Sequence, residues 1–138
     1  MAKIHAYLNF NGECESAFSF YEKVFNTKNI GMHRFGDMPV DPNYTIREQD
    51  KQKIMHTAIN INPDTMIMGS DCLESFGQKI NPGNNSYIML DTDSANEATT
   101  LYNALTEDAK NIEMPLAEQP WAELYSSFQD KYGICWMV

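Results

Sequence analysis

The chain has 138 residues, of which 43% are hydrophobic, and this allows one compact domain or two smaller units that share a core. Its formal net charge of −9 at pH 7 disfavours phosphate backbones and anionic lipid, so we expect neither nucleic acid nor membrane partners. Three widely spaced cysteines and an N-terminus without a secretory pattern predict free thiols and a cytoplasmic location.

The first half predicts a strand, a helix and three further strands. Residues 3–10 alternate as a strand does, and its two faces differ in character: Ala6, Leu8 and Phe10 lie on one, and His5, Tyr7 and Asn9 on the other. Apolar residues then recur at helical spacing through ECESAFSFYEKVF. Short strands are predicted at about 29–35, 53–62 and 65–70, before a turn-rich stretch, DCLESFGQKINPGN.

The second half begins the same series again. Residues 86–92 alternate, with Tyr87 on the polar face. Ser94 and Glu97 have the S-x-x-E spacing of a capping box, which predicts the start of an amphipathic helix that reaches Leu105. Strand-like segments at about 110–114, 123–129 and 133–138 follow.

The order strand–helix–strand–strand–strand therefore occurs twice. It predicts an α+β fold of two βαβββ modules, at about 1–71 and about 85–138, joined by a linker at about 72–84 within a single domain. Each helix is expected to cover one face of its curved sheet. The remaining faces, which carry His5 and Tyr7 in one module and Tyr87 in the other, are expected to form a cup for a small molecule.

Several segments resemble one known family in the right order: YLNFNGECESAFSFYEKVF, RFGDMP, KIMHTAINI, MIMGSD and MPL…QPWAELYSSFQDKYGICWMV. They resemble the PhnB-like branch of the vicinal-oxygen-chelate superfamily, which includes glyoxalases, bleomycin-resistance proteins and extradiol dioxygenases. The resemblance covers nearly the whole chain and implies paired modules, a curved-sheet cup and a homodimer. Ala122 and Ser126 depart from the family pattern, which usually has glycine at both places.

The resemblance also implies where a divalent metal would bind in metal-dependent members, on the first and last strands of each module. Carried over to this chain, it gives one good candidate, His5, with Tyr87 at the matching place and Met137 where a glutamate would be needed. Such metals need three or four converging N, O or S ligands, so we expect no complete metal site. The alternative is a site at His5 and His56 completed by a carboxylate such as Asp37 or Asp71.

The leading interpretation is a small-molecule-binding protein without a cofactor, whose ligand is apolar or carries an aromatic ring. The predicted contacts are His5, Tyr7, Asp37, Met38, His56, Tyr87 and Trp136. His5 and His56 are also candidate acids or bases, because imidazole titrates near neutral pH. Asp37 and Met38 belong to the loop from Gly36 to Gln52, interpreted as a movable pocket wall.

Two rival interpretations stay open at this point. One is a metal-dependent isomerase, lyase or dioxygenase of the same superfamily, and the other is a dimeric interaction module with no ligand. Many members of the resembled branch carry the label 3-demethylubiquinone-9 3-methyltransferase. Methyl transfer from S-adenosylmethionine is not expected here, because the seven glycines never form a GxG pair and two helices cannot flank a parallel sheet.

Overall fold

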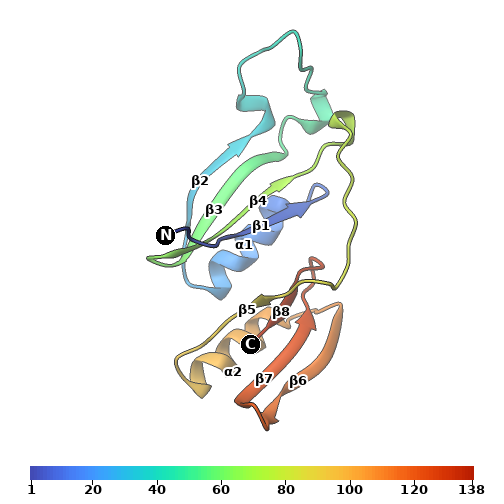
Figure 1. Ribbon diagram of the computed structural model, residues 1–138. Helices are drawn as coiled ribbons and strands as arrows, with labels where there is room; N and C mark the ends of the chain where they lie inside the picture. The colour runs from blue at the N-terminus through green and yellow to red at the C-terminus, as the bar shows by residue number, and fades with distance from the viewer. The chain divides into compact units, whose positions relative to one another are not determined.

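A computed structural model describes residues 1–138 as two compact units, unit 1 at Met1–Asn81 and unit 2 at Pro82–Val138 (Figure 1). The elements of unit 1 are β1 (Ala6–Phe10), α1 (Cys14–Val24), β2 (Asn29–Arg34), β3 (Ile54–Asn62) and β4 (Thr65–Asp71), with short 3-10 helices η1 (Phe35–Asp37), η2 (Glu48–Asp50) and η3 (Glu74–Phe76). Those of unit 2 are β5 (Ile88–Met89), α2 (Ala95–Leu105), β6 (Asn111–Gln119), β7 (Ala122–Gln129) and β8 (Cys135–Met137). The predicted α+β class and element order are confirmed.

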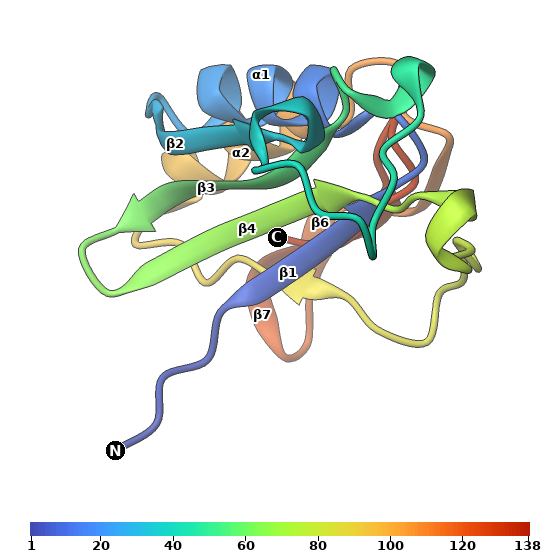
Figure 2. The same cartoon turned by 90° about the horizontal axis from the view of Figure 1, so that it is seen from above.

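Each unit contains one four-stranded sheet, in the orders β1-β4-β3-β2 and β5-β8-β7-β6. The first strand of each unit runs parallel to the last, and the other pairs are antiparallel. Figure 2 shows β4 lying between β1 and β3 in unit 1. The chain therefore folds the same small motif twice.

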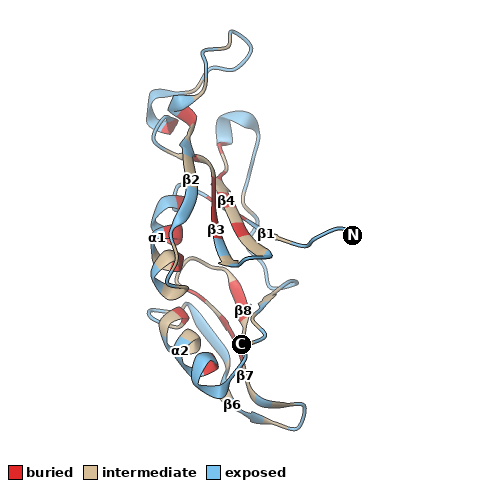
Figure 3. Cartoon of the chain, turned by 90° about the vertical axis from the view of Figure 1, so that its left-hand side faces the viewer, coloured by how far each residue is buried: buried red, intermediate tan, exposed pale blue.

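The core of unit 1 lies between α1 and one face of the sheet (Figure 3). Leu8, Phe18 and Ile67 are buried there. The helix approaches β4 so closely that a Cβ at Gly69 would lie 2.5 Å from Phe18 Cε2, which explains why this strand position has no side chain. Asp71 joins the two layers, because its Oδ1 accepts the amide N–H at the start of α1 and its Oδ2 accepts that at the start of β3.

Unit 2 builds its core in the same manner under α2. The ring of Tyr102 meets Phe128 edge to face, with 5.7 Å between ring centroids. The helix begins at the predicted cap, where Ser94 Oγ accepts the Glu97 N–H at 3.1 Å. Glu97 Oε1 in turn accepts the N–H of Asp93, the residue before the cap, at 3.1 Å. The capping interaction is therefore confirmed, with its second bond shifted by one residue.

Two strands of unit 2 differ from their predicted lengths. The strand predicted at 86–92 pairs only at Ile88–Met89, and the one predicted at about 110–114 continues to Gln119. The longer strand, β6, lies at the edge of the sheet and contains Pro115. Proline has no backbone N–H to donate, and an edge strand tolerates this because it pairs with a neighbour on one side only. The two helices have eleven residues each, and no helix is long and apolar enough to cross a membrane.

Candidate functional site

Each sheet has a helix on one face and presents the other as an open face. In unit 1 the alternation predicted for β1 is confirmed, since Leu8 and Phe10 are buried whereas the Tyr7 side of the strand is exposed. Strand pairing continues this face from Tyr7 on β1 through Met68 on β4 to Ala58 on β3. We call this side of unit 1, which bears His5, Tyr7, Asn9, His56 and Met68, the open face of sheet 1.

Three of the predicted site residues lie on the open face of sheet 1, and two of them are in contact. Tyr7 Oη lies 3.3 Å from His56 Nδ1, and the two rings are 5.8 Å apart at an interplanar angle of 30°. His5 precedes Tyr7 by two positions, and its Nδ1 accepts the backbone N–H of Met66 at 3.1 Å. Both histidines are half-buried, and Tyr7 is 47% exposed. The arrangement is a polar and aromatic surface on a rigid sheet.

A third histidine, His33, pairs directly with His56 across β2 and β3. The spacing of the histidines carries no signal for this pairing, because two register irregularities between β2 and β3 decide which residues face each other.

Asp37 and Met38 occupy the 3-10 turn after β2. Asp37 is exposed, and its carboxylate accepts the Arg34 backbone N–H at 3.3 Å, which closes that turn. Later in the same loop, the buried carboxylate of Asp50 forms ion pairs of 2.9 Å with Arg47 and Lys53. Neither Asp37 nor Met38 is hydrogen-bonded to the histidines, and their role as a pocket wall stays a prediction.

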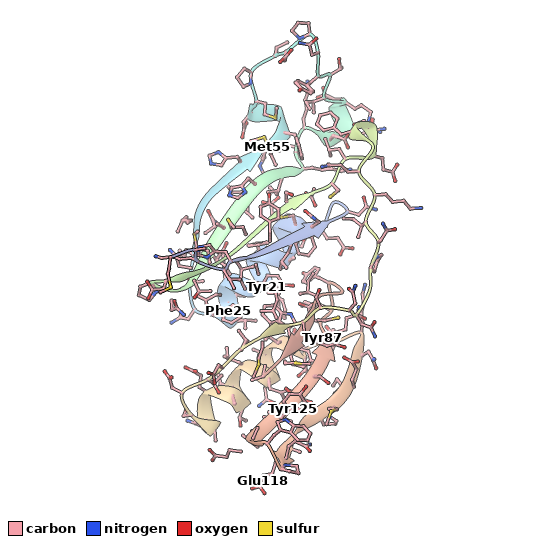
Figure 4. All side chains as sticks on the ribbon, viewed as in Figure 1. Tyr21, Phe25, Met55, Tyr87, Glu118 and Tyr125 are labelled. Atoms are coloured by element: carbon pink, nitrogen blue, oxygen red, sulfur yellow. The ribbon has the colours of Figure 1, made fainter.

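Tyr87 directly precedes the edge strand β5 (Figure 4), and alternation places it on the face opposite Ile88, which we call the open face of sheet 2. Its Oη donates to both carboxylate oxygens of Glu113, at 2.6 and 2.8 Å. This hydrogen bond is the main cause that raises the pKa of Tyr87 to about 12, because the bonded carboxylate would repel a phenolate. Glu113 was not predicted from the sequence. Tyr87 and Glu113 lie 26 positions apart in the chain and at opposite edges of the sheet.

A pocket of about 280 Å³ adjoins this pair. It is lined by Pro82, Gly83, Asn84, Asn111, Glu113, Gln129 and Cys135. Burial raises the pKa of the Cys135 thiol, and its Sγ lies 3.6 Å from the carbonyl oxygen of Gly83. A protonated, hydrogen-bonded thiol is a poor nucleophile, so the pocket offers polar contacts and a carboxylate more than covalent chemistry.

Trp136 does not belong to an open face, and its prediction as a ligand contact is wrong. It pairs with Ile88 on one side and with Phe128 on the other, and Phe128 meets α2 through Tyr102. The indole is fully buried, and its Nε1 donates to Asp130 Oδ2 at 2.8 Å. Because side chains alternate along β8, its strand neighbours occupy the open side instead.

Comparison with known proteins agrees with this architecture. The family model described as 3-demethylubiquinone-9 3-methyltransferase matches residues 2–138. The chain belongs to this family. It is similar to the solved structure of protein PA1353 from Pseudomonas aeruginosa, with 33% identity, a TM-score of 0.86 and coverage of 100% of this chain and 96% of that one.

Two further proteins extend the comparison. The PhnB protein from Bacillus cereus is 25% identical, with a TM-score of 0.69 and coverage of 99% and 97% of the two chains. Protein YjdN from Escherichia coli K12 is 28% identical over an alignment 137 residues long that covers 96% of this chain and 90% of YjdN. The fosfomycin resistance protein FosX from Listeria monocytogenes, at 12% identity and a TM-score of 0.56, shares the fold alone. The predicted PhnB-like branch of the superfamily is confirmed.

The metal-binding positions of the superfamily do not fit a metal in this PhnB-like chain. No group of three or more His, Cys, Asp or Glu side chains is arranged to hold an ion. His5 Nδ1 accepts a peptide N–H, so the neutral ring carries its proton on Nε2 and has no lone pair left there for a metal. Asp71 cannot complete the alternative site, because it is buried on the α1 side and both of its oxygens accept backbone N–H groups.

Proposed function

We propose that this PhnB-like protein is a cytoplasmic homodimer that binds a small molecule on the open face of sheet 1 without a metal or other cofactor. The observation that carries the proposal is the contact between Tyr7 and His56. The ring of Tyr7 is 47% exposed and contacts the imidazole of His56 on the open face of sheet 1. Convergent polar groups on an aromatic surface are typical of a binding site.

We infer that the methyl transfer named in the family's description does not proceed here from S-adenosylmethionine. Nucleotide-type cofactors bind at the carboxyl ends of parallel strands beside a glycine-rich helix start. Each sheet of this chain has a single parallel pair, and α1 begins at Cys14 after Gly12 alone. Gly69, the glycine nearest to α1 within a strand, serves close packing against Phe18.

The proposal is tested by a thermal-shift screen with small aromatic compounds, followed by calorimetric titration of each compound that raises Tm. A ligand that binds the native state alone adds about 2.7 kcal/mol at a concentration 100 times its Kd. We expect the shift to disappear in Tyr7→Ala. It should persist in Tyr44→Ala, which removes a similarly exposed tyrosine that packs on Phe76 instead.

Three results would count against the proposal. A hit that survives Tyr7→Ala unchanged would place the ligand elsewhere, and a library without any hit would favour the interaction module. Elemental analysis of protein purified without chelator provides the third, since stoichiometric metal that is lost in His5→Ala would favour the metal-dependent enzymes. Sedimentation equilibrium tests the proposed homodimer separately, and a protein that stays monomeric at every concentration would refute the homodimer.

A further inference from the structure

We infer that the ligand of the open face of sheet 1 carries an oxyanion, a carboxylate or a phosphonate, held by the Nε2–H groups of His5 and His56. This inference rests on the proposed function and specifies the chemistry of the same site. It begins with His5, whose Nδ1 lies 3.1 Å from the peptide nitrogen of Met66. A peptide N–H can only donate, so Nδ1 is the acceptor and the neutral ring carries its hydrogen on Nε2.

The same assignment holds for His56. Its Nδ1 lies 3.3 Å from Tyr7 Oη, and an imidazole nitrogen is a stronger hydrogen-bond acceptor than a phenol oxygen. With the phenol as the donor, the neutral ring of His56 carries its hydrogen on Nε2. No protein group accepts from Nε2 of either ring. Two such donors on one face suit a ligand that brings hydrogen-bond acceptors.

The charge distribution opposes an anionic ligand less in unit 1 than in unit 2. Unit 1 has eight Lys and Arg residues against ten Asp and Glu, whereas unit 2 has two against nine. Within the four strands of unit 1, Asp71 is the single acidic residue, and both of its oxygens are occupied on the α1 side. The open face of sheet 1 thus has no strand carboxylate to repel an anion, although the chain as a whole is acidic.

The experiment compares four probes that share one ring: benzoate, phenylphosphonate, benzylamine and benzyl alcohol. Calorimetry or ligand-observed NMR should show benzoate or phenylphosphonate binding at least about 10-fold more tightly than benzylamine, since a hydrogen bond to a charged partner contributes more than one to a neutral partner. The preference between the two anions distinguishes a carboxylate from a phosphonate ligand. If benzyl alcohol or benzylamine binds best and Tyr7→Ala abolishes that binding, the proposed function stands and the oxyanion inference is refuted.

Variants locate the donors. His56→Phe keeps a ring but removes the donor, and we expect at least about a 10-fold loss of anion affinity. His33→Phe is the matched control, because His33 faces His56 but has no partner that sets its tautomer. Equal losses in the two variants would overturn the assignment of donors. Absence of binding by all four probes would refute both proposals.

A second measurement does not depend on any ligand. Long-range proton–nitrogen NMR spectra distinguish the two tautomers of each histidine, and we expect His5 and His56 to carry hydrogen on Nε2 at a pH where they are neutral. A spectrum that places the hydrogen of either ring on Nδ1 would overturn the inference, whatever the probes show.

Discussion

The two hydrogen bonds of Asp71 are expected to make it one of the most sensitive positions of unit 1. Its side chain is 2% exposed and accepts the N–H of Cys14 at 3.0 Å and that of Ile54 at 2.8 Å. In Asp71→Asn one oxygen becomes an NH₂ group that points at a backbone donor. One bond is lost, a buried N–H loses its acceptor, and the negative charge that strengthened the other bond disappears.

The expected cost follows from these contacts. A hydrogen bond to a charged group contributes about 1.5–3 kcal/mol, and a buried donor without a partner adds a desolvation penalty of similar size. Allowing for relaxation, we expect Asp71→Asn to lower the free energy of unfolding by about 2–4 kcal/mol. A domain is stable by only about 5–15 kcal/mol, so the loss is large.

Urea unfolding followed by circular dichroism measures this difference from the midpoint, at an unchanged slope. Asp64→Asn is the matched control, because Asp64 is exposed and its pairing with Lys3 is long, at 3.9 Å. The control should stay within about 0.5 kcal/mol of the wild type. If Asp71→Asn also stayed within that range, the bridge from α1 to β3 would not stabilise the unit, and our account of the sheet would be wrong.

Three further variants test the packing, the phenol–carboxylate pair and the helix cap. Gly69→Ala should lower the free energy of unfolding in urea by about 1–3 kcal/mol, because its Cβ would overlap the Phe18 ring. Gly83 has open space around it, so Gly83→Ala should leave the urea midpoint unchanged. Equal effects of the two variants would contradict the close approach of α1 to β4. Tyr87 has a pKa raised to about 12 against an ordinary value of about 10, so its stabilising effect is present below about pH 10 and is lost as the pH rises toward 12. The difference in unfolding midpoint between wild type and Tyr87→Phe should therefore shrink over that range, and a constant difference would speak against the pair. Ser94→Ala should lower the free energy of unfolding, measured from the urea midpoint, by about 1 kcal/mol through loss of the cap, and an unchanged midpoint would contradict it.

The side of β1 on which Tyr7 lies could be predicted from the sequence, but the partners of that side chain could not. Alternation along β1 placed Tyr7 on the side opposite Leu8, because a strand imposes a period of two on its own residues. The contact of Tyr7 with His56 joins residues 49 positions apart, and that of Tyr87 with Glu113 joins residues 26 apart. Such pairs depend on which strands are neighbours and in which register.

Local periodicity and local hydrogen bonding by themselves determined the order of elements, the inward side of β1 and the start of α2 at Ser94. Tertiary structure alone decided that Trp136 lies under α2 and that His33 faces His56. The physical reason is that a shift of one residue in strand pairing moves every side chain to the other face, and that shift is set by bulges and by packing between distant segments.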